Sequence, residues 1–236
     1  MRLELRWREE DGARLASSVW RAGPGLRTIS SAMLGGGIGA ASWVLNAQVA
    51  GAYARTDPVA HLRELAASHG LDGPGVGMLT AASVARTARG SDEGVAVSAT
   101  VGLRVPTWAS SPAGAPDPEL VPLQVDGPPP PRVHRPGTVN IVVSLPVPLE
   151  DAALVNAVMT ATEAKTQALL EAGYPCTGTA SDAICVAAPA PVPGGTEPDP
   201  FAGPRSVWGA RIARAVHAAV YAGAVDYTEW IDGTRR

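Results

Sequence analysis

The sequence predicts an α+β fold: a layered α/β sandwich with a mostly antiparallel sheet and about three main helices. Three observations support this prediction. Apolar residues make up 46% of the 236-residue chain, which is enough to build a sizeable core. Segments that alternate apolar and polar residues are joined by tight turns. The resulting hairpins outnumber β-α-β units, which favours a layered α+β domain over a doubly wound sheet.

The first part of the chain is predicted to form strands followed by one helix. Asp11-Gly12 is typical of a hairpin turn, and Asp57-Pro58 of a helix start with Asp57 as its N-cap. Gly70 marks the end of that helix. In order, we expect a hairpin of residues 2–9 and 13–21, buried strands at 27–33 and 41–50, and a helix from Pro58 to about His69.

A second hairpin and a proline-rich segment follow. Residues 77–88 and 94–105 are predicted to pair across the polar turn Arg89-Gly90-Ser91-Asp92. Residues at about 106–136 include Pro128-Pro129-Pro130-Pro131, and such a run favours polyproline II over a helix or a strand ladder. We expect a surface insertion without chemistry, since a buried strand resumes at 138–143.

The last part of the chain is predicted to alternate helices and strands. Residues 149–172 are expected to form the longest helix, 180–188 a strand and 206–223 an amphipathic helix that follows a proline-rich loop at 189–204. No internal repeat is evident. We therefore expect a single domain over residues 1–236.

Composition excludes several functional classes. A net charge of −3 and a pI near 5.8 provide no basic field for nucleic acid. The N-terminus lacks the apolar core of a signal peptide, and the longest uncharged stretch contains five glycines, unlike a membrane-spanning helix. Cys176 and Cys185 are too few for a disulfide framework and lack metal-ligand spacing. We expect a cytoplasmic protein that binds neither nucleic acid nor a membrane and holds no metal.

The glycine-rich segment does not match a nucleotide-binding motif. It lacks the Gly-Lys-Ser/Thr ending of a phosphate loop. Gly35, Gly37 and Ala40 imitate the spacing of a dinucleotide fingerprint, but Asp57 begins a helix where that fingerprint requires the end of a strand. The glycines instead allow backbone to approach a bulky ligand, or simply form a tight bend.

The helix at 149–172 carries the only lysine among 19 basic residues, Lys165. A helical wheel at 100° per residue places it in one apolar stripe, and Glu163 on the polar side. A buried ammonium must find a partner or lose its proton. Alternatively, Lys165 extends to the surface from the edge of the stripe. The stripe comprises Val155, Val158, Thr162, Lys165 and Leu169.

A run of hydroxyls follows this helix. Thr177, Thr179 and Ser181 would project from one face of an extended segment, with Asp182 on the other. Asp182 is the best candidate partner for Lys165, because adjacent elements tend to be neighbours in space. Alternatively, the segment is a turn in which the hydroxyls satisfy backbone groups.

Other polar residues give weaker signals. Asn46 and Asn140 interrupt apolar strands, so each needs a hydrogen-bond partner and each could orient a substrate amide. Ser30 and Ser31 precede the glycines without an obvious base. His61 lies one helical turn after Asp57 and is more often a boundary residue than a ligand. No Gly-x-Ser-x-Gly, His-Glu-x-x-His or Cys-x-x-Cys motif is present.

Several of these segments together resemble the adenosylcobinamide amidohydrolase family. The resemblance covers most of the chain apart from the first twenty or so residues and the proline-rich insertion. Ser181 stands where threonine is more usual. The matching segments are Ser30-Ser31-Ala32, Gly35-Gly36-Gly37, Asp57-Pro58, Gly77-Met78-Leu79-Thr80-Ala81, Gly137-Thr138-Val139-Asn140-Ile141, Thr160-Ala161-Thr162-Glu163-Ala164-Lys165, and Thr177-Gly178-Thr179-Ala180-Ser181-Asp182-Ala183, with the final helix after Phe201-Ala202-Gly203.

The resemblance implies corrinoid salvage, in which the amide between the aminopropanol arm and the corrin ring of adenosylcobinamide is hydrolysed to adenosylcobyric acid. The corrinoid is the expected partner, cobalt arrives within it, no cofactor is required, and a homo-oligomer is compatible with the sequence. The candidate catalytic residues are Lys165, Asp182, Thr162, Thr179 and Glu163, where Thr162, Thr179 or a water held by Asp182 would attack. The candidate substrate-binding residues are Ser30, Ser31, Gly36, Gly37, Asn46, His61, Asn140 and Thr177.

Within this set, Asn140, Asn46 or backbone amides near Gly35 to Gly37 would stabilise the oxyanion. Two alternatives use the same residues differently. A corrinoid-binding module without catalysis would use the same glycine-lined surface, with His61 as a cobalt ligand. A thiol-dependent hydrolase would use Cys176 or Cys185, for which the sequence indicates no activating base.

Overall fold

The computed structural model describes residues 1–51, 53–113 and 137–234. It confirms the predicted α+β class with three helices and a mostly antiparallel sheet. The helices are α1 (Pro58–Ser68), α2 (Asp151–Glu171) and α3 (Val207–Thr234). The strands are β1 (Glu4–Glu10), β2 (Ala13–Ser30), β3 (Gly37–Gln48), β4 (Gly75–Thr80), β5 (Ala88–Asp92), β6 (Val95–Gly102), β7 (Pro106–Thr107), β8 (Thr138–Ser144), β9 (Gly178–Thr179) and β10 (Ala183–Pro189).

Eight strands form one sheet, in the order β4-β3-β2-β10-β8-β6-β5, and β1 pairs with β2. Two of its pairings are parallel, β3 with β4 and β8 with β10. Each parallel pair is joined by a helix, because parallel neighbours need a long crossover. β7 and β9 form a separate two-stranded sheet.

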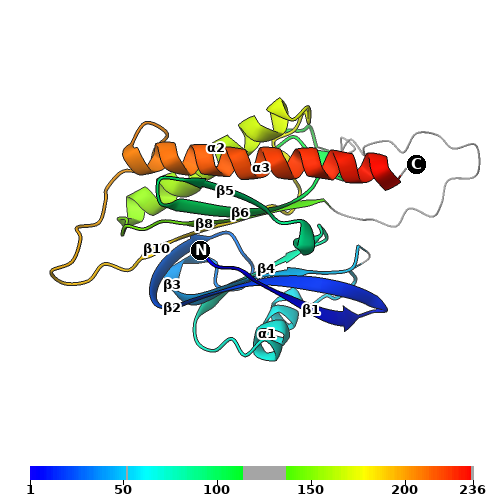
Figure 1. Cartoon of the computed structure of the whole chain (residues 1–236), viewed down its shortest axis with the longest axis horizontal. Coiled ribbons are helices and arrows are strands. Elements are labelled where there is room, and N and C mark those ends of the chain that lie inside the picture. The colour runs from blue at the N-terminus through cyan, green and yellow to red at the C-terminus, as the bar shows by residue number, and fades with distance from the viewer. Residues whose placement is uncertain (52, 114–136, 235–236) are drawn as a thin grey trace, which may run out of the picture.

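The sheet curls, so that β2, β3 and β4 lie beneath β6, β8 and β10 (Figure 1). α2 and α3 lie side by side over the upper strands, and α1 covers the lower ones (Figure 1). Three apolar layers result. The largest lies between α2, α3 and the upper strands, a second between the two parts of the sheet, and a third against α1. Burial of these layers is the main stabilising term of the fold.

The first hairpin forms as predicted, but its second strand is longer than expected. β2 contains the predicted strand at 13–21 and residues 27–30 of the predicted strand at 27–33, because its pairing with β3 shifts register between Arg21 and Leu26 instead of ending. Gly23 and Gly25 adopt positive φ at this irregularity. β3 also starts earlier than predicted, at Gly37.

The predicted hairpin of 77–88 and 94–105 is wrong. Residues 75–80 form β4, which pairs in parallel with β3, and a 3-10 turn at Val84–Arg86 leads into β5. The hairpin that does form joins β5 and β6 through Glu93 and Gly94, both at positive φ. Residues 106–107, expected inside the insertion, form β7. Residues 108–113 form no helix or strand, and residues 114–136 of the proposed insertion lie outside the described residues.

The helices deviate in smaller ways. α3, with 28 residues, exceeds the 21 of α2, which was expected to be the longest. α1 ends as predicted, with Gly70 at φ 62° and the Leu71 amide bonded to Ala66 O. Asp57 does not cap α1 through its side chain; it binds Arg55 instead. No helix in the described part of the chain is long and apolar enough to cross a membrane.

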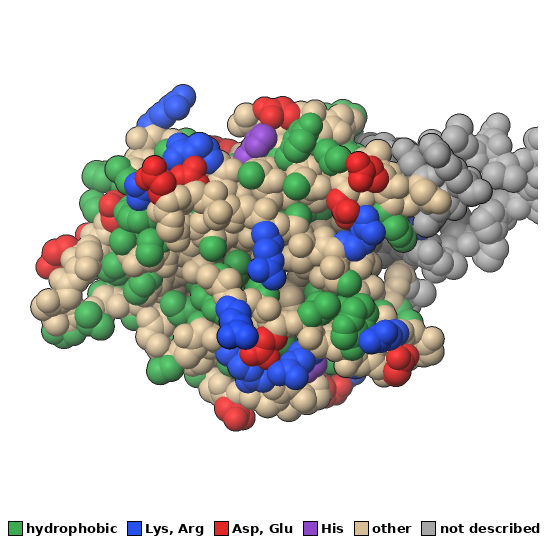
Figure 2. Space-filling view, viewed as in Figure 1, with side chains coloured by type: hydrophobic (Ala, Val, Ile, Leu, Met, Phe, Trp, Pro, Cys, Tyr) green, Lys and Arg blue, Asp and Glu red, His purple; other side chains and the backbone are tan. Residues whose placement is uncertain are grey.

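Charged side chains of both signs are interspersed over the face seen in Figure 2. Among the described residues, two ion pairs join α3 to the β5–β6 hairpin: Arg214 with Asp92 at 2.6 Å, and Arg211 with Glu93. The guanidinium of Arg214 lowers the pKa of the Asp92 carboxyl. Such exposed pairs contribute little to stability. The packing of α3 on β5 therefore rests on close backbone approach and apolar contact.

Gly90 in β5 tests this close approach. A Cβ at Gly90 would lie 2.1 Å from Ala215 O of α3. We expect Gly90→Ala to lower the free energy of unfolding by roughly 1–3 kcal/mol, since one element must shift. The measurement is urea denaturation, with Gly39→Ala as the matched control, because a Cβ at Gly39 meets nothing within 4 Å. Equal stability of the two variants would contradict this packing.

Candidate active site

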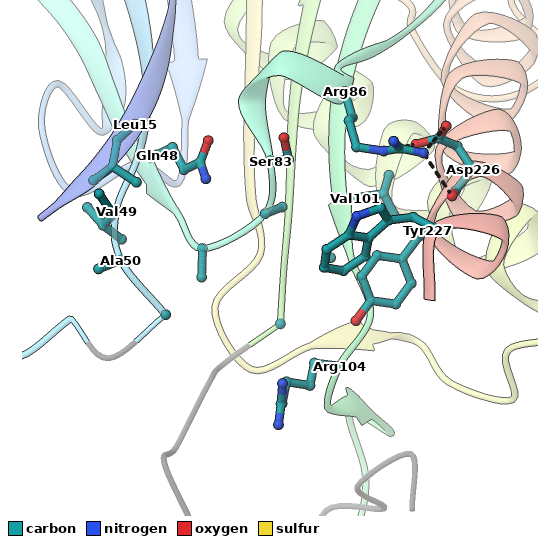
Figure 3. Close-up of a pocket in the computed structure, with 17 residues that line it drawn as sticks. Leu15, Gln48, Val49, Ala50, Ser83, Arg86, Val101, Arg104, Asp226 and Tyr227 are labelled. Carbon is teal, nitrogen blue, oxygen red and sulfur yellow. Dashed lines mark hydrogen bonds and ion pairs between the residues drawn. The ribbon is translucent and has the colours of Figure 1, made fainter. Parts of the chain in front are cut away.

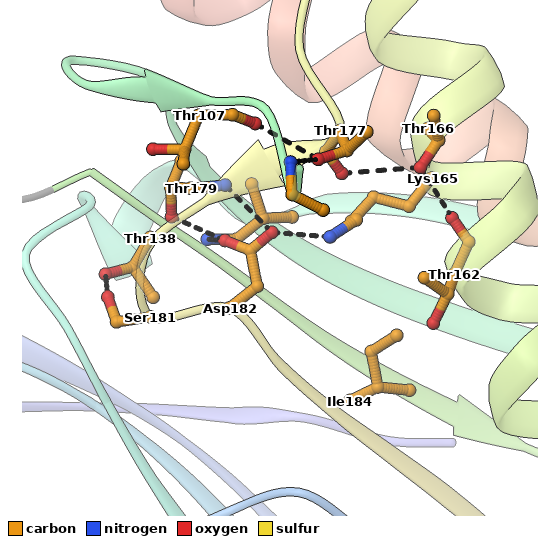
Figure 4. Close-up of polar contacts among 12 residues, drawn as sticks. Thr107, Thr138, Thr162, Lys165, Thr166, Thr177, Thr179, Ser181, Asp182 and Ile184 are labelled. Carbon is orange, nitrogen blue, oxygen red and sulfur yellow. Dashed lines mark hydrogen bonds and ion pairs between the residues drawn. The ribbon is translucent and has the colours of Figure 1, made fainter. Parts of the chain in front are cut away.

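Lys165 and Asp182 form a buried ion pair between α2 and the start of β10 (Figure 4). Lys165 Nζ lies 2.5 Å from Asp182 Oδ2, and the two side chains are 8% and 11% exposed. The predicted partnership is confirmed, and the alternative of a lysine extending to the surface is wrong. Burial makes each charge depend on the other, since an unpaired ion at this depth is very costly.

The Asp182 carboxylate accepts four hydrogen bonds. Besides the ammonium of Lys165, Oδ2 accepts the amide N–H of Thr179 at 3.1 Å. Oδ1 accepts the amide N–H of Val139 at 2.9 Å and the hydroxyl of Thr179 at 2.5 Å. The carboxylate thereby connects α2, β8, β9 and β10. Charge-assisted bonds of this kind are among the strongest that side chains make.

Gly178 covers the ion pair. A Cβ at this position would lie 2.2 Å from Asp182 Oδ2 and 2.5 Å from Lys165 Nζ, so no larger residue fits. β9, which holds Gly178, is fixed by its pairing with Thr107 of β7. The role of this glycine was not predicted from the sequence, where its position between two threonines is the only signal.

The prediction that the three hydroxyls after α2 share one face of an extended segment, with Asp182 on the other, is wrong. β9 ends at Thr179 and the chain turns, which brings Thr179 and Asp182 together. The single hydroxyl proton of Thr179 has two acceptors in reach, Asp182 Oδ1 at 2.5 Å and Gly137 O at 2.9 Å. Thr177 instead bonds Thr107 O and the Ala109 amide, as expected of a turn. The Ser181 hydroxyl lies 2.9 Å from that of Thr138 (Figure 4).

The structure does not bring Thr162 and Glu163 to the ion pair. Both are exposed on α2, and the Thr162 hydroxyl donates to Val158 O one turn earlier. The predicted stripe is wrong at Thr162 and Val155, because the buried face of α2 is built mainly from alanines that lie against the sheet and α3. Glu163 faces a groove of about 390 Å³ between α2 and α3, lined also by Gln167 and His217. The buried residues of α2 are Ala153, Leu154, Ala157, Thr160, Ala161, Ala164, Lys165, Ala168 and Leu169.

Asn46 and Asn140 hydrogen-bond to each other across the two parts of the curled sheet. Asn140 Nδ2 donates to Asn46 Oδ1 and to Leu79 O, both at 2.9 Å, and Asn46 Nδ2 donates to Thr100 Oγ1 at 3.1 Å. The expectation that each needs a partner is confirmed. Both amide protons of Asn140 are thus committed, which leaves its Oδ1 without a partner among the described residues. Asn140 therefore has no amide proton left to donate to an oxyanion, whereas its Oδ1 can still accept a hydrogen bond.

Ser30 and Ser31 fasten the loop after β2 to β10. Ser30 Oγ donates to Ile184 O at 3.0 Å, and Ser31 Oγ accepts the Ile184 amide at 3.1 Å. Gly36 lies in the same loop, and Gly37 is the first residue of β3. A Cβ at Gly36 would lie 2.4 Å from Ala32 O, and Gly37 has φ 82°. The glycines thus allow a tight bend; Gly36 lines a groove of about 420 Å³ against α1, on the other side of the sheet from α2.

His61 is also separate from the ion pair. It is buried on α1, with Nδ1 3.1 Å from the Tyr53 hydroxyl and Nε2 3.2 Å from Glu10 Oε1. Its ring stacks on that of Tyr53. Both ring nitrogens are therefore engaged, so a role as cobalt ligand would require breaking one of these contacts. Within residues 1–51, 53–113 and 137–234, no three His, Cys, Asp or Glu side chains cluster as metal ligands.

Comparison with known proteins finds similarity to one family. A family model described as adenosylcobinamide amidohydrolase matches residues 3–232. A protein of that name from Halobacterium salinarum is 42% identical over 120 residues, 50% of this chain and 49% of the relative. Another from Methanosarcina mazei is 28% identical over 195 residues, 80% of this chain and 86% of the relative. The match therefore spans about half the length of the Halobacterium protein.

The two cysteines are expected to be unreactive in the native protein. Both are buried, and burial raises the pKa of Cys185 to about 12 and that of Cys176 above its usual value. Neutral thiols out of contact with solvent are poor nucleophiles. Iodoacetamide at pH 8, followed by mass spectrometry, should modify neither cysteine in the folded protein and both in urea. Rapid native labelling with loss of activity would restore the thiol-dependent alternative.

Proposed function

The chain belongs to the adenosylcobinamide amidohydrolase family, and from this premise we propose that it hydrolyses the amide between the aminopropanol arm and the corrin ring of adenosylcobinamide. The products are adenosylcobyric acid and aminopropanol, which places the reaction in corrinoid salvage. The observation that carries the proposal is the contact series from Thr179 through Asp182 to Lys165. It has the form of a nucleophile, a base and a group that orients the base.

Thr179 is the proposed nucleophile. Its hydroxyl lies 2.5 Å from Asp182 Oδ1, within reach for proton transfer. As Oγ1 forms a bond to the amide carbon, its proton passes to Asp182. Exposed Thr162 makes no contact with the carboxylate in the described structure, so Thr179 and a water are the attacking groups that remain from the sequence analysis.

Asp182 next returns the proton to the amide nitrogen as the C–N bond breaks. Aminopropanol leaves as a neutral amine, and the corrinoid remains as an ester on Thr179. A water then gives one proton to Asp182 while its oxygen attacks the ester carbon. The proton returns to Thr179 Oγ1 as adenosylcobyric acid leaves. The sum of these steps is one amide and one water converted to one acid and one amine.

Lys165 holds Asp182 in place and balances its charge throughout. An ammonium fits under Gly178, whereas the planar guanidinium of arginine is wider and binds carboxylates through a fork. These steps use only the protein and water, so we propose that no added cofactor is required and that cobalt enters as part of the substrate. The proposed partner is the corrinoid itself.

Substitution of the ion pair tests the centre. We expect Asp182→Asn and Lys165→Arg each to lower aminopropanol release from adenosylcobinamide by at least about 10²-fold, the usual contribution of a positioned base. Asp182→Asn also destabilises the fold, because the charge of Lys165 is left buried without its partner. The double variant Lys165→Met with Asp182→Asn separates these effects: it should regain stability without activity. Exposed Glu197→Gln is the control, expected at the wild-type rate. Near-wild-type turnover in both single variants would show that the ion pair is not the catalytic centre. If the wild type releases no aminopropanol, the alternative of a corrinoid-binding module without catalysis is favoured.

Thr179 is tested separately. Thr179→Ala should lose at least about 10²-fold in turnover, whereas Thr179→Ser retains the hydroxyl and should recover most of it. Acid quenching during turnover, followed by peptide mass spectrometry, should reveal the corrinoid ester on the peptide containing Thr179. Full activity of Thr179→Ala would assign the attack to a water held by Asp182.

A further inference from the structure

A groove of about 460 Å³ opens where the end of α3 meets the ends of β3, β4 and β6 (Figure 3). Its volume is in the range of small-molecule sites. Its walls combine small apolar residues with two aromatic rings and a few polar groups. None of the residues predicted from the sequence to bind substrate lines it. The side chains used below are Arg86, Arg104, Asp226, Tyr227 and Trp230.

Gly137 connects this groove to the proposed catalytic cluster. It lines the groove, and its carbonyl accepts hydrogen bonds from Thr179 Oγ1 at 2.9 Å and Ser181 Oγ at 3.3 Å. A Cβ at Gly137 would lie 3.2 Å from Thr179 Cγ2 and 2.6 Å from Gly102 O. Gly137 therefore has the groove on one side and contacts the proposed nucleophile, Thr179, on the other.

The groove presents aromatic faces beside a cation. Tyr227 and Trp230 lie on α3 with ring centroids 6.1 Å apart, and Trp230 is 48% exposed. Tyr227 lies between Arg86 and Arg104 in Figure 3. Arg86 is held by Asp226 at 2.6 Å and 2.8 Å, whereas Arg104 is exposed and has no ion pair within the described residues. Arg104 is thus available to donate to a carbonyl.

We propose that this groove binds the edge of the corrin ring of the substrate. The inference rests on the proposed function. A corrin is a flat conjugated macrocycle whose rim carries amide side chains, and the scissile amide stands on one short arm from that rim. Aromatic residues stack on such a ring, and an arginine that has no ion pair among the described residues can donate to rim amides. A ring seated here leaves only the arm to pass Gly137 toward Thr179.

The test measures binding apart from turnover. Adenosylcobyric acid, which has no arm to hydrolyse, is bound in equilibrium dialysis and detected by its visible absorbance. We expect Trp230→Ala to weaken binding about tenfold and Arg104→Ala roughly threefold to tenfold, magnitudes typical of one stacked ring and one charged hydrogen bond. Trp230→Phe should retain most of the affinity. In turnover of adenosylcobinamide, these variants should raise KM with little change in kcat.

Two matched variants control for general effects. Trp7→Ala removes a tryptophan of similar exposure, 45%, that stacks on Arg14 of β2, and Arg205→Ala removes an exposed arginine before the start of α3. Both should bind the corrinoid as the wild type does, and thermal melting checks that all variants fold. If Trp230→Ala and Arg104→Ala bind the corrinoid as the wild type does, and the wild type releases aminopropanol, the groove is not the corrin-binding site and the proposed function stands. If these two variants bind the corrinoid more weakly but the wild type releases no aminopropanol, the proposed hydrolysis is wrong and the groove remains the corrin-binding site.

Discussion

The buried pair of Lys165 and Asp182 is the constraint on which the candidate site depends. One carboxylate satisfies donors from a helix, two backbone amides and a hydroxyl, so its loss would leave several groups unpaired at once. The β8-α2-β10 crossover makes the pair possible. Parallel pairing aligns Ala183 with Asn140, and this register sets Asp182 beside the Val139 amide while α2 returns above it.

Glycines then determine what surrounds the pair. Gly178 closes one side at a distance that no Cβ tolerates, and Gly137 separates the pair's threonine partner from the groove at the end of α3. The curl of the sheet contributes too, because the bond between Asn46 and Asn140 holds its two parts together near this end. Backbone approach, more than side-chain chemistry, therefore sets the shape of the site.

The sequence predicted those features that depend on neighbours along the chain. The turn of the first hairpin and the end of α1 were visible locally, and Asp182 lies only 17 residues after Lys165, in the segment that follows α2, so the ion pair could be foreseen. Features that depend on distant packing could not. The parallel pairing of β4 needs β3 as its partner, Thr162 is exposed because alanines form the packed face of α2, and the groove gathers residues from α3 and several strand ends.

The lone lysine among 19 basic residues has a physical explanation in this arrangement. The space under Gly178 admits a compact ammonium that meets one carboxylate oxygen, and leaves the other oxygen to Thr179. A guanidinium binding in its usual fork would engage both oxygens and compete with the threonine hydroxyl. The restriction to one oxygen is what keeps a hydroxyl and a carboxylate in proton-transfer contact. For that reason the identity of this cation matters to the proposed chemistry as well as to the fold.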